Sequence, residues 1–491
     1  MRGLIDEGLW RRPNYAVDDM AELEQLCLRE AEAIGLQPPP VVFHLVRAEV
    51  VYDVSARGLP GRYSHWRFGQ IYEQMKRDHD AGRSRIYELV VNTHPAHAYL
   101  LDGNSLVAQL LVIAHVLGHA VVFDRSRYFE PADKGFLTRV RAAAERIDRY
   151  MTQYGRAVVE DFIDACEALA TTLPLSQLGG RYVEEEPSDW PQPYDELFPA
   201  EVDARRQRVA EERERLRRRF PRHPERDILG FVMQHARYLE DWQRDVIGII
   251  REDQRYFAPQ FTTKLIHEGM ATWTHNTLLQ RLRLGSADFV EYQALNAAVT
   301  QPHHFRINPY NLGWLLMREI ERIAREPSDE ERERWSWAGE IDPVEQLLHI
   351  VEGYDDASLV AEFVTDRVCE EAKLYSWARS AQPPGLQITN RDPGEVRAAL
   401  LRSHVNAGLP VVEIVDANRA GRGELVLEHR VEGVGLDPEY AKGTLVHLAA
   451  LWGSGVEICT VEGQDGKPVT YRASPGDASV EEIRQPTAVE T

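Results

Sequence analysis

The strongest constraint on the fold is an apolar run of 18 residues, Leu106–Phe123, in a chain of 491 residues. It is interrupted by only four residues: Gln109, His115, Gly118 and His119. A run of this length is just sufficient to span a bilayer. Two histidines in its middle would be costly in lipid, however, and no asymmetry of Lys and Arg flanks it. We therefore predict no membrane span but a fully buried helix of a soluble protein, with Asn104 or Ser105 as its N-cap.

The two histidines of this run form the most informative motif in the chain. His115 and His119 are four residues apart, so a helix presents both imidazoles on one face, as it does when two histidines bind one metal ion. Gly118 lies between them and would let another element approach closely. In the usual zinc-hydrolase helix a glutamate follows the first histidine and acts as general base. Here that residue is Val116, so any base must come from elsewhere; the alternative is a pair of core histidines with ordinary hydrogen-bond partners.

A second segment, His267–His275, could supply the third ligand from another helix. Glu268, Thr272 and His275 lie near one stripe of such a helix. Glu268 and His275 are about two turns, or roughly 10 Å, apart, so we do not expect them to bind the same ion. His267 points about 100° away from Glu268 and fits better behind a ligand, or as an alternative ligand if the helix is turned. The alternative for Glu268 is a salt bridge at a helix end.

Three residues outside the helical turn of His115 are candidates for the general base of this site. They are Glu88, Glu240 and His267. Glu240 lies in an acidic segment with Asp241 and Asp245, and it could be a base or could orient another group. Such residues more often form ordinary ion pairs, so the choice among the three stays open.

The composition restricts the compartment and the partners. The chain has 57 Lys and Arg against 78 Asp and Glu, a formal charge of −21, which argues against generic binding of nucleic acid or anionic membranes. An arginine-rich run within residues 201–226 is interleaved with glutamates and is typical of a solvated helix with internal pairs; RNA binding through residues 205–222 is a third, weaker alternative. Isolated cysteines without a CxxC pair suit a reducing cytosol as small buried residues. They are Cys27, Cys166, Cys369 and Cys459.

The hydrophobic period changes near residues 381–385, which indicates a domain boundary. Residues 1–380 predict a large, mainly α-helical domain that carries the candidate metal site. Residues 386–475 follow a β-α-β-β-α-β order, which predicts a smaller ferredoxin-like α/β sandwich domain. Residues 476–491 lack periodicity and predict a disordered tail. The fold class is therefore α+β.

Several short stretches, in the same order along the chain, resemble the SpoVR family (stage V sporulation protein R). Together they are specific, although no one of them would suffice. They are Tyr63–Gly69 (YSHWRFG), Ile86–Asn92 (IYELVVN), Ala98–Leu101 (AYLL), Asn104–Leu106 (NSL), Leu111–His119 (LVIAHVLGH), Leu239–Asp245 (LEDWQRD), Glu268–Ala271 (EGMA) and Ile307–Gly313 (INPYNLG).

The resemblance implies a cytoplasmic bacterial protein linked to sporulation, in particular to formation of the spore cortex. In bacteria that do not sporulate it implies a role in stress or stationary phase, often alongside a serine kinase system. The histidine-pair helix and the Glu268 helix look like a degenerate metallopeptidase arrangement. Two departures from the family pattern fall in this segment: His267 replaces the usual Asn and Met270 the usual Trp.

The leading hypothesis is a divalent metal site, zinc by preference, formed by His115, His119 and Glu268. A metal-bound water would hydrolyse an amide bond in peptides or peptidoglycan precursors, with Glu88, Glu240 or His267 as base. The rival hypothesis is a non-enzymatic regulator or scaffold. In that protein the histidines and the glutamate only stabilise the fold, and the C-terminal domain binds a partner or a small ligand.

Overall fold

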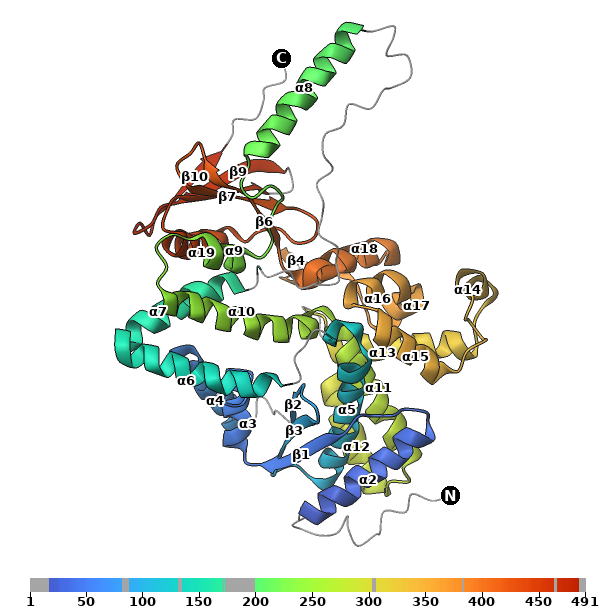
Figure 1. Cartoon of the computed structure of the whole chain (residues 1–491). Coiled ribbons are helices and arrows are strands. Elements are labelled where there is room, and N and C mark those ends of the chain that lie inside the picture. Colours follow the sequence, from blue (N-terminus) through green and yellow to red (C-terminus); the bar gives the residue numbers. More distant parts are fainter. Residues whose placement is uncertain are drawn as a thin grey trace. The chain divides into compact units, whose positions relative to one another are not determined.

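The computed structural model describes residues 17–81, 88–130, 135–170, 172, 199–302, 306–381, 384–462 and 466–484. The chain divides into two compact units, each built from two segments: Met1–Gln153 with Tyr256–Ala407, and Tyr154–Arg255 with Gly408–Thr491. The predicted α+β class is confirmed, because a helical N-terminal region is followed by a C-terminal five-stranded mixed sheet (Figure 1).

The apolar run forms α5 (Leu106–Arg125), the central helix of the first unit. Ser105 is the N-cap, and its hydroxyl accepts a hydrogen bond from the Ala108 N–H at 3.1 Å. Among the described residues α5 is the one helix long and apolar enough to cross a membrane, and its apolar window is fully buried inside the protein. It packs against α2 (Val17–Ala33) and α11 (Lys264–Arg281). It is therefore a core helix, as the two mid-run histidines predict.

Glycines let α11 approach α5 on one side and α13 (Pro309–Arg325) on the other. A Cβ added to Gly118 would lie 2.6 Å from the Cα of Ala271 on α11. A Cβ added to Gly269 would lie 2.6 Å from the carbonyl carbon of Gly313 on α13. No side chain fits at such distances, so these glycines bring the three helices to backbone contact. The role predicted for Gly118 is thus confirmed.

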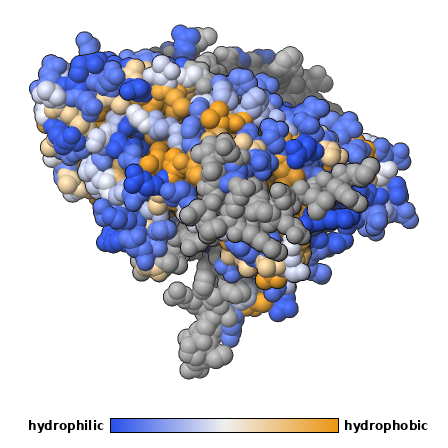
Figure 2. All heavy atoms as spheres, turned by 90° about the horizontal axis from the view of Figure 1, so that it is seen from below, coloured by the Kyte–Doolittle hydropathy of each residue, from blue (hydrophilic) through white to orange (hydrophobic). Residues whose placement is uncertain are grey.

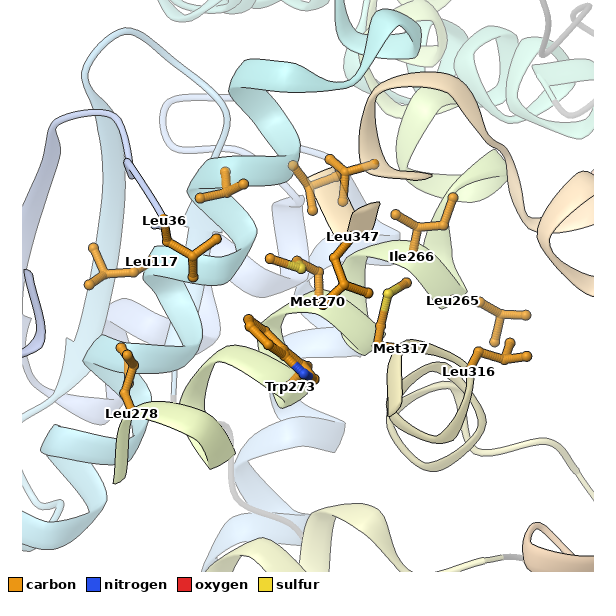
Figure 3. Close-up of a cluster of buried hydrophobic side chains, with 14 of the residues drawn as sticks. Leu36, Leu117, Leu265, Ile266, Met270, Trp273, Leu278, Leu316, Met317 and Leu347 are labelled. Carbon is orange, nitrogen blue, oxygen red and sulfur yellow. The ribbon is translucent and has the colours of Figure 1, made fainter. Parts of the chain in front are cut away.

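The main core surrounds this three-helix contact. Figure 3 shows Met270 and Trp273 of α11 close to Met317 of α13, and Leu117 of α5 among the same buried cluster on the side of Leu36. Each is at most 2 % exposed, and burying a side chain of this kind contributes about 1.5–3 kcal/mol. The Trp273 indole N–H satisfies its hydrogen bond by donating to Glu321 at 2.8 Å. This packing fixes the relative position of the helices that carry the candidate ligands.

A three-stranded sheet lies beside these helices, in the order β1 (Val41–Val46), β3 (Ala96–Leu101), β2 (Glu88–Val91). β1 and β3 are parallel, and β2 pairs with β3 in the antiparallel sense. A separate hairpin pairs β4 (Ser376–Ala381) with β5 (Pro384–Asn390). Further helices of this unit are α3 (Ala48–Arg57), α4 (Trp66–Asp80), α6 (Phe136–Tyr154), α12 (Ser286–Thr300), α14 (Asp329–Arg334), α15 (Pro343–Gly353), α16 (Asp356–Phe363), α17 (Asp366–Glu371) and α18 (Pro393–His404).

The second unit contains a five-stranded sheet in the order β10 (Val480–Arg484), β9 (Lys467–Ala473), β8 (Val456–Glu462), β7 (Glu424–Arg430), β6 (Val411–Arg419). β7 and β8 are parallel and are joined by α19 (Pro438–Trp452), which packs on the sheet; the other neighbours are antiparallel. The helices of the other segment of this unit are α7 (Arg156–Ala170), α8 (Pro199–Arg218), α9 (Ile228–His235) and the first part of α10 (Asp241–Thr262).

Residues 154–255 group with the C-terminal sheet because they make direct contacts with it. α7 packs against α19. The backbone of Glu225 pairs with Ile414 of β6 in both directions, at 3.0 and 2.8 Å. The buried carboxylate of Glu413 on β6 also pairs with Arg226 at 2.7 Å. Such contacts join segments that are far apart in the sequence, so no local sequence pattern predicts them.

The order of the C-terminal strands differs from the ferredoxin-like arrangement that the sequence predicted. The strand expected over 386–389 is β5, but it pairs with β4 across a short connection instead of entering the five-stranded sheet. A hairpin partner close in sequence costs little loop entropy, which favours this pairing. The sheet instead gains β10, so residues 480–484 of the predicted disordered tail form a strand against β9. Residues 485–491 lie outside the described residues.

The chain carries a formal charge of −21, and charged residues make up 27 % of it. On the face in Figure 2, hydrophilic residues cover most of the coloured surface and hydrophobic ones form small patches. α8 carries the arginine-rich run, and most of its described side chains are exposed. Within it Gln207 donates to Glu211 one turn further on, at 3.1 Å. These features are those of a solvated helix.

Candidate metal centre

Three candidate ligands meet where α5 faces α11. His115 and His119 stand one turn apart on α5, with their ring centroids separated by 4.7 Å. Glu268 comes from α11, and its Oε2 lies 3.7 Å from Nε2 of His115 and 3.6 Å from Nε2 of His119. One ligand atom from each residue lies within 4.8 Å of the others, so the cluster could hold a metal ion.

The spacing of these atoms suits a tetrahedral ion. Zinc binds imidazole nitrogen and carboxylate oxygen at about 2.0–2.2 Å, which places neighbouring ligand atoms of a tetrahedron about 3.4 Å apart. The observed 3.6 and 3.7 Å are close to that value. Two histidines and one glutamate are also a ligand set of catalytic zinc sites, in which a fourth position stays open. The residues present therefore fit such an ion.

The cluster contains buried polar atoms that other protein groups do not satisfy. The side chains of His115, His119 and Glu268 are only 4 %, 12 % and 16 % exposed. Among the described residues no hydrogen-bond partner is within reach of His115 Nε2 or Glu268 Oε2. An unpaired buried polar atom costs about 1–3 kcal/mol. Nε2 of His115 and Oε2 of Glu268 face each other across 3.7 Å. A site that holds a cation is expected to present such a pair of unpartnered atoms.

Burial keeps the histidines neutral, which is the form that binds metal. Removal from water lowers the pKa of His115 and of His119 to about 3. A hydrogen bond to the Ala271 backbone opposes the shift at His115, and the charge of Glu268 opposes it at His119, but burial dominates in both cases. Burial likewise raises the pKa of Glu268, against the influence of His119.

Two further histidines from α11 support the ligand rings from behind. Nδ1 of His275 lies 3.0 Å from Nδ1 of His115, and Nδ1 of His267 lies 2.9 Å from Nδ1 of His119. Both contacts leave the Nε2 atoms of the ligands directed at the cluster. His267 thus stands behind a ligand. The sequence predicted only that His275 does not bind the same ion as Glu268. It could not place His275 behind His115, because that position depends on how α5 and α11 cross.

Glu88 and Tyr310 complete the surroundings of the cluster. Oε1 of Glu88, on β2, lies 3.9 Å from Nε2 of His115. Burial and the nearby charge of Glu268 raise the pKa of Glu88 to about 8. Tyr310 stacks on the His115 ring at 5.9 Å and donates a hydrogen bond to Glu268. Sequence reasoning missed Tyr310, although it lies in one of the stretches that carry the family resemblance.

Glu240, the other candidate base, is not brought into this cluster. It belongs to the second unit, and its carboxylate accepts a hydrogen bond from the Trp242 indole at 3.2 Å. This contact orders the first turn of α10 and gives Glu240 a structural role within its own unit.

Fold and site together define an α+β protein whose helical unit presents a buried His–His–Glu cluster able to hold a metal ion. A family model described as "SpoVR like protein" matches residues 14–409, and one described as "SpoVR-like C-terminal domain" matches residues 410–463. The chain therefore belongs to the SpoVR family, as the resemblance predicted, and this membership suggests a sporulation-related protein. The family boundary after residue 409 nearly coincides with the boundary of the two units after Ala407.

A curated relative extends this similarity over most of the chain. An uncharacterized protein of Escherichia coli strain K12, YcgB, is 26 % identical over 455 residues, which is 88 % of this chain and 89 % of that protein. No solved structure matches the chain.

Proposed function

We propose that this protein is a metal-dependent hydrolase of amide bonds. One divalent ion, with zinc the best fit, would be held by Nε2 of His115, Nε2 of His119 and a carboxylate oxygen of Glu268. The observation that carries the proposal is the convergence of these buried atoms at near-tetrahedral spacing, with His115 Nε2 and Glu268 Oε2 lacking a protein partner. When bound, such an ion supplies Lewis acidity and makes hydroxide available at neutral pH.

The surrounding residues suit the remaining tasks of amide hydrolysis. Glu88 lies on the His115 side of the cluster, where the charge of a bound cation would favour its ionised form. Its carboxylate would then take a proton from the attacking water. The water oxygen bonds to the amide carbon, the carbon–nitrogen bond breaks, and Glu88 returns the proton to the leaving amine. Tyr310 holds the Glu268 carboxylate by its hydrogen bond and covers the His115 ring. We assign the base to Glu88, because His267 is turned toward His119.

The substrate class and the cellular setting come from the family resemblance. We propose peptides or peptidoglycan precursors in the cytoplasm as substrates, with a link to spore cortex formation or to stress. A serine kinase system is the proposed functional partner.

Metal analysis tests the site. Protein purified without chelator and dialysed against zinc should hold one zinc per chain by mass spectrometry. The variants His115→Ala and Glu268→Gln should hold less than about a tenth of that amount at the same free zinc. His429→Ala is the matched control, because it removes a buried histidine of the second unit, where Nδ1 contacts Thr460. Wild-type protein without stoichiometric metal would refute the site.

Activity requires a second measurement. Zinc-loaded protein is incubated with soluble peptidoglycan precursors, and newly released amino groups are counted. We expect release that Glu88→Gln lowers by about 10²–10⁴-fold while one zinc per chain is retained. Metal binding without any release would instead support a regulator that uses the ion to hold its fold.

A further inference from the structure

A chain of buried hydrogen bonds runs from the backbone of α11 through α12 to the back of His115. It begins at the Thr272 carbonyl, which accepts from Nδ2 of Asn276 at 2.9 Å. Oδ1 of Asn276 then accepts from Nδ2 of Asn296 at 3.0 Å and from the Tyr292 hydroxyl at 2.7 Å. The Asn276, Asn296 and His275 side chains, which we call the Asn–His chain, are all at most 8 % exposed.

This chain has a fixed polarity because its first acceptor is a backbone carbonyl. A carbonyl oxygen can only accept, so the Asn276 amide must direct its NH2 group at Thr272 and its oxygen at Nδ2 of Asn296. The second N–H of Asn276 donates to Oδ1 of Asn296 at 3.2 Å. The oxygen of Asn276 in turn requires the NH2 group of Asn296. Oδ1 of Asn296 therefore faces Nε2 of His275, at 2.9 Å. Two acceptors would repel at that distance, so Nε2 of His275 carries a proton and donates it to Asn296.

The proton on Nε2 of His275 determines what happens at His115. A neutral imidazole has one N–H and one acceptor nitrogen, so Nδ1 of His275 is an acceptor. It lies 3.0 Å from Nδ1 of His115, which must then carry the proton of the His115 ring. Nε2 of His115 is left with a free lone pair, and that is the atom directed at Glu268.

We propose that the Asn–His chain, anchored at the Thr272 carbonyl, holds His115 in the Nδ1–H tautomer and so prepares its Nε2 as a metal ligand before any ion arrives. The tautomer itself is a property of the metal-free protein and does not depend on the proposed function. Its role in preparing a metal ligand rests on the proposed function. Asn296 is a positioning residue: it touches no ligand atom of the cluster and acts through His275. No comparable anchor exists among the described residues for His267, whose Nε2 has no hydrogen-bond partner.

Asn296→Leu tests the polarity, because leucine has nearly the same size and cannot accept a hydrogen bond. Nδ2 of Asn276 lies 3.1 Å from Nε2 of His275 and can donate to it once Asn296 is gone. His275 would then carry its proton on Nδ1 and donate to His115. The tautomer of His115 should invert, which places the proton on the atom that must bind the metal.

The readout is long-range proton–nitrogen correlation NMR of metal-free protein labelled with 15N-histidine, with His115→Gln identifying the His115 signals. We expect the proton on Nδ1 of His115 in the wild type and on Nε2 in Asn296→Leu. Zinc titration should show an affinity about 10–100-fold lower for Asn296→Leu. Thr300→Val is the matched control: it removes a buried hydrogen bond to the Asn296 backbone at 2.8 Å, and it should change neither readout.

Three outcomes overturn the inference: a wild-type His115 protonated at Nε2, an Asn296→Leu protein with an unchanged tautomer, or an equal effect of Thr300→Val. Thermal unfolding of both variants establishes that they are folded. A wild type that shows the expected tautomer but binds no zinc would refute the proposed function, and the tautomer assignment would stand on the metal-free spectra.

Discussion

Gly118→Ala is the substitution that best separates the geometry of the cluster from the stability of the fold. The added Cβ would lie 2.6 Å from Cα of Ala271, 2.9 Å from Oγ1 of Thr274 and 3.1 Å from the Ala271 nitrogen. Two of these three neighbours are backbone atoms, which cannot rotate away. Ordinary contact begins at 3.4 Å, so α5 and α11 must separate by about 0.8 Å or more.

The two consequences differ in size. Overpacking of this kind costs about 1–3 kcal/mol, while alanine in place of glycine favours a helix by about 1 kcal/mol, so the net loss of unfolding free energy should be about 0–2 kcal/mol. A metal site tolerates errors of only about 0.2 Å in its ligand distances. A shift of about 0.8 Å between His115 and Glu268 should therefore lower zinc affinity by at least about tenfold.

The assay combines zinc titration with denaturant unfolding of the metal-free protein. Gly69→Ala is the control, because Gly69 lies inside α4 and a Cβ there would meet nothing within 4 Å. That variant should gain up to about 1 kcal/mol and bind zinc as the wild type does. If Gly118→Ala behaves like Gly69→Ala in both measurements, the close approach of α5 and α11 does not govern the site.

Two further predictions concern α11 and its supports. Asp356 accepts hydrogen bonds from the Leu265 and Ile266 N–H groups at 2.8 and 3.2 Å, and burial, with the charge of Asp355 adding to it, raises its pKa to about 7. Because the folded protein then keeps a proton that the unfolded chain releases near pH 4, the contribution of this group to stability is complete below about pH 4 and decreases as the pH rises through 7. Asp356→Asn should flatten unfolding free energy against pH over that interval, and an unchanged slope would contradict the assignment. Gly313→Ala should be more damaging than Gly118→Ala, since its Cβ would lie 2.4 Å from the Leu265 carbonyl oxygen; thermal unfolding of the metal-free proteins should show a midpoint several degrees lower, and equal midpoints would contradict it.

Local sequence patterns predicted much of the secondary structure, because the residues that determine a helix or a strand are neighbours in the sequence. The apolar run gave α5, and the changing periods after residue 390 gave α18, β6, β7, α19, β8 and β9 within a few residues. The pairing of β5 with β4, and of β10 with β9, depends on competition between partners for the same strand edges. Period and composition carry no information on that competition, so the ferredoxin-like order was wrong although its elements were mostly right.

The candidate site divides in the same way. The spacing of His115 and His119 and the nearby Glu268 could be recognised from residue types, because one turn of a helix determines which side chains share a face. The positions of His275, Asn296 and Tyr310 depend on how α11, α12 and α13 cross α5. The approach of α11 to α5 and to α13 is set by backbone contacts at Gly118, Gly269 and Gly313. A glycine in a sequence shows that close approach is allowed, but it does not name the partner.

Anomalous diffraction at the zinc edge, on crystals of the zinc-loaded protein, tests the central claim most directly. We expect one strong peak per chain, about 2.0–2.2 Å from Nε2 of His115, Nε2 of His119 and a carboxylate oxygen of Glu268. The same data from Glu268→Gln should show that peak lost or strongly weakened. A zinc-loaded wild-type crystal with no peak at this cluster, or with its peak on other residues, would contradict the account.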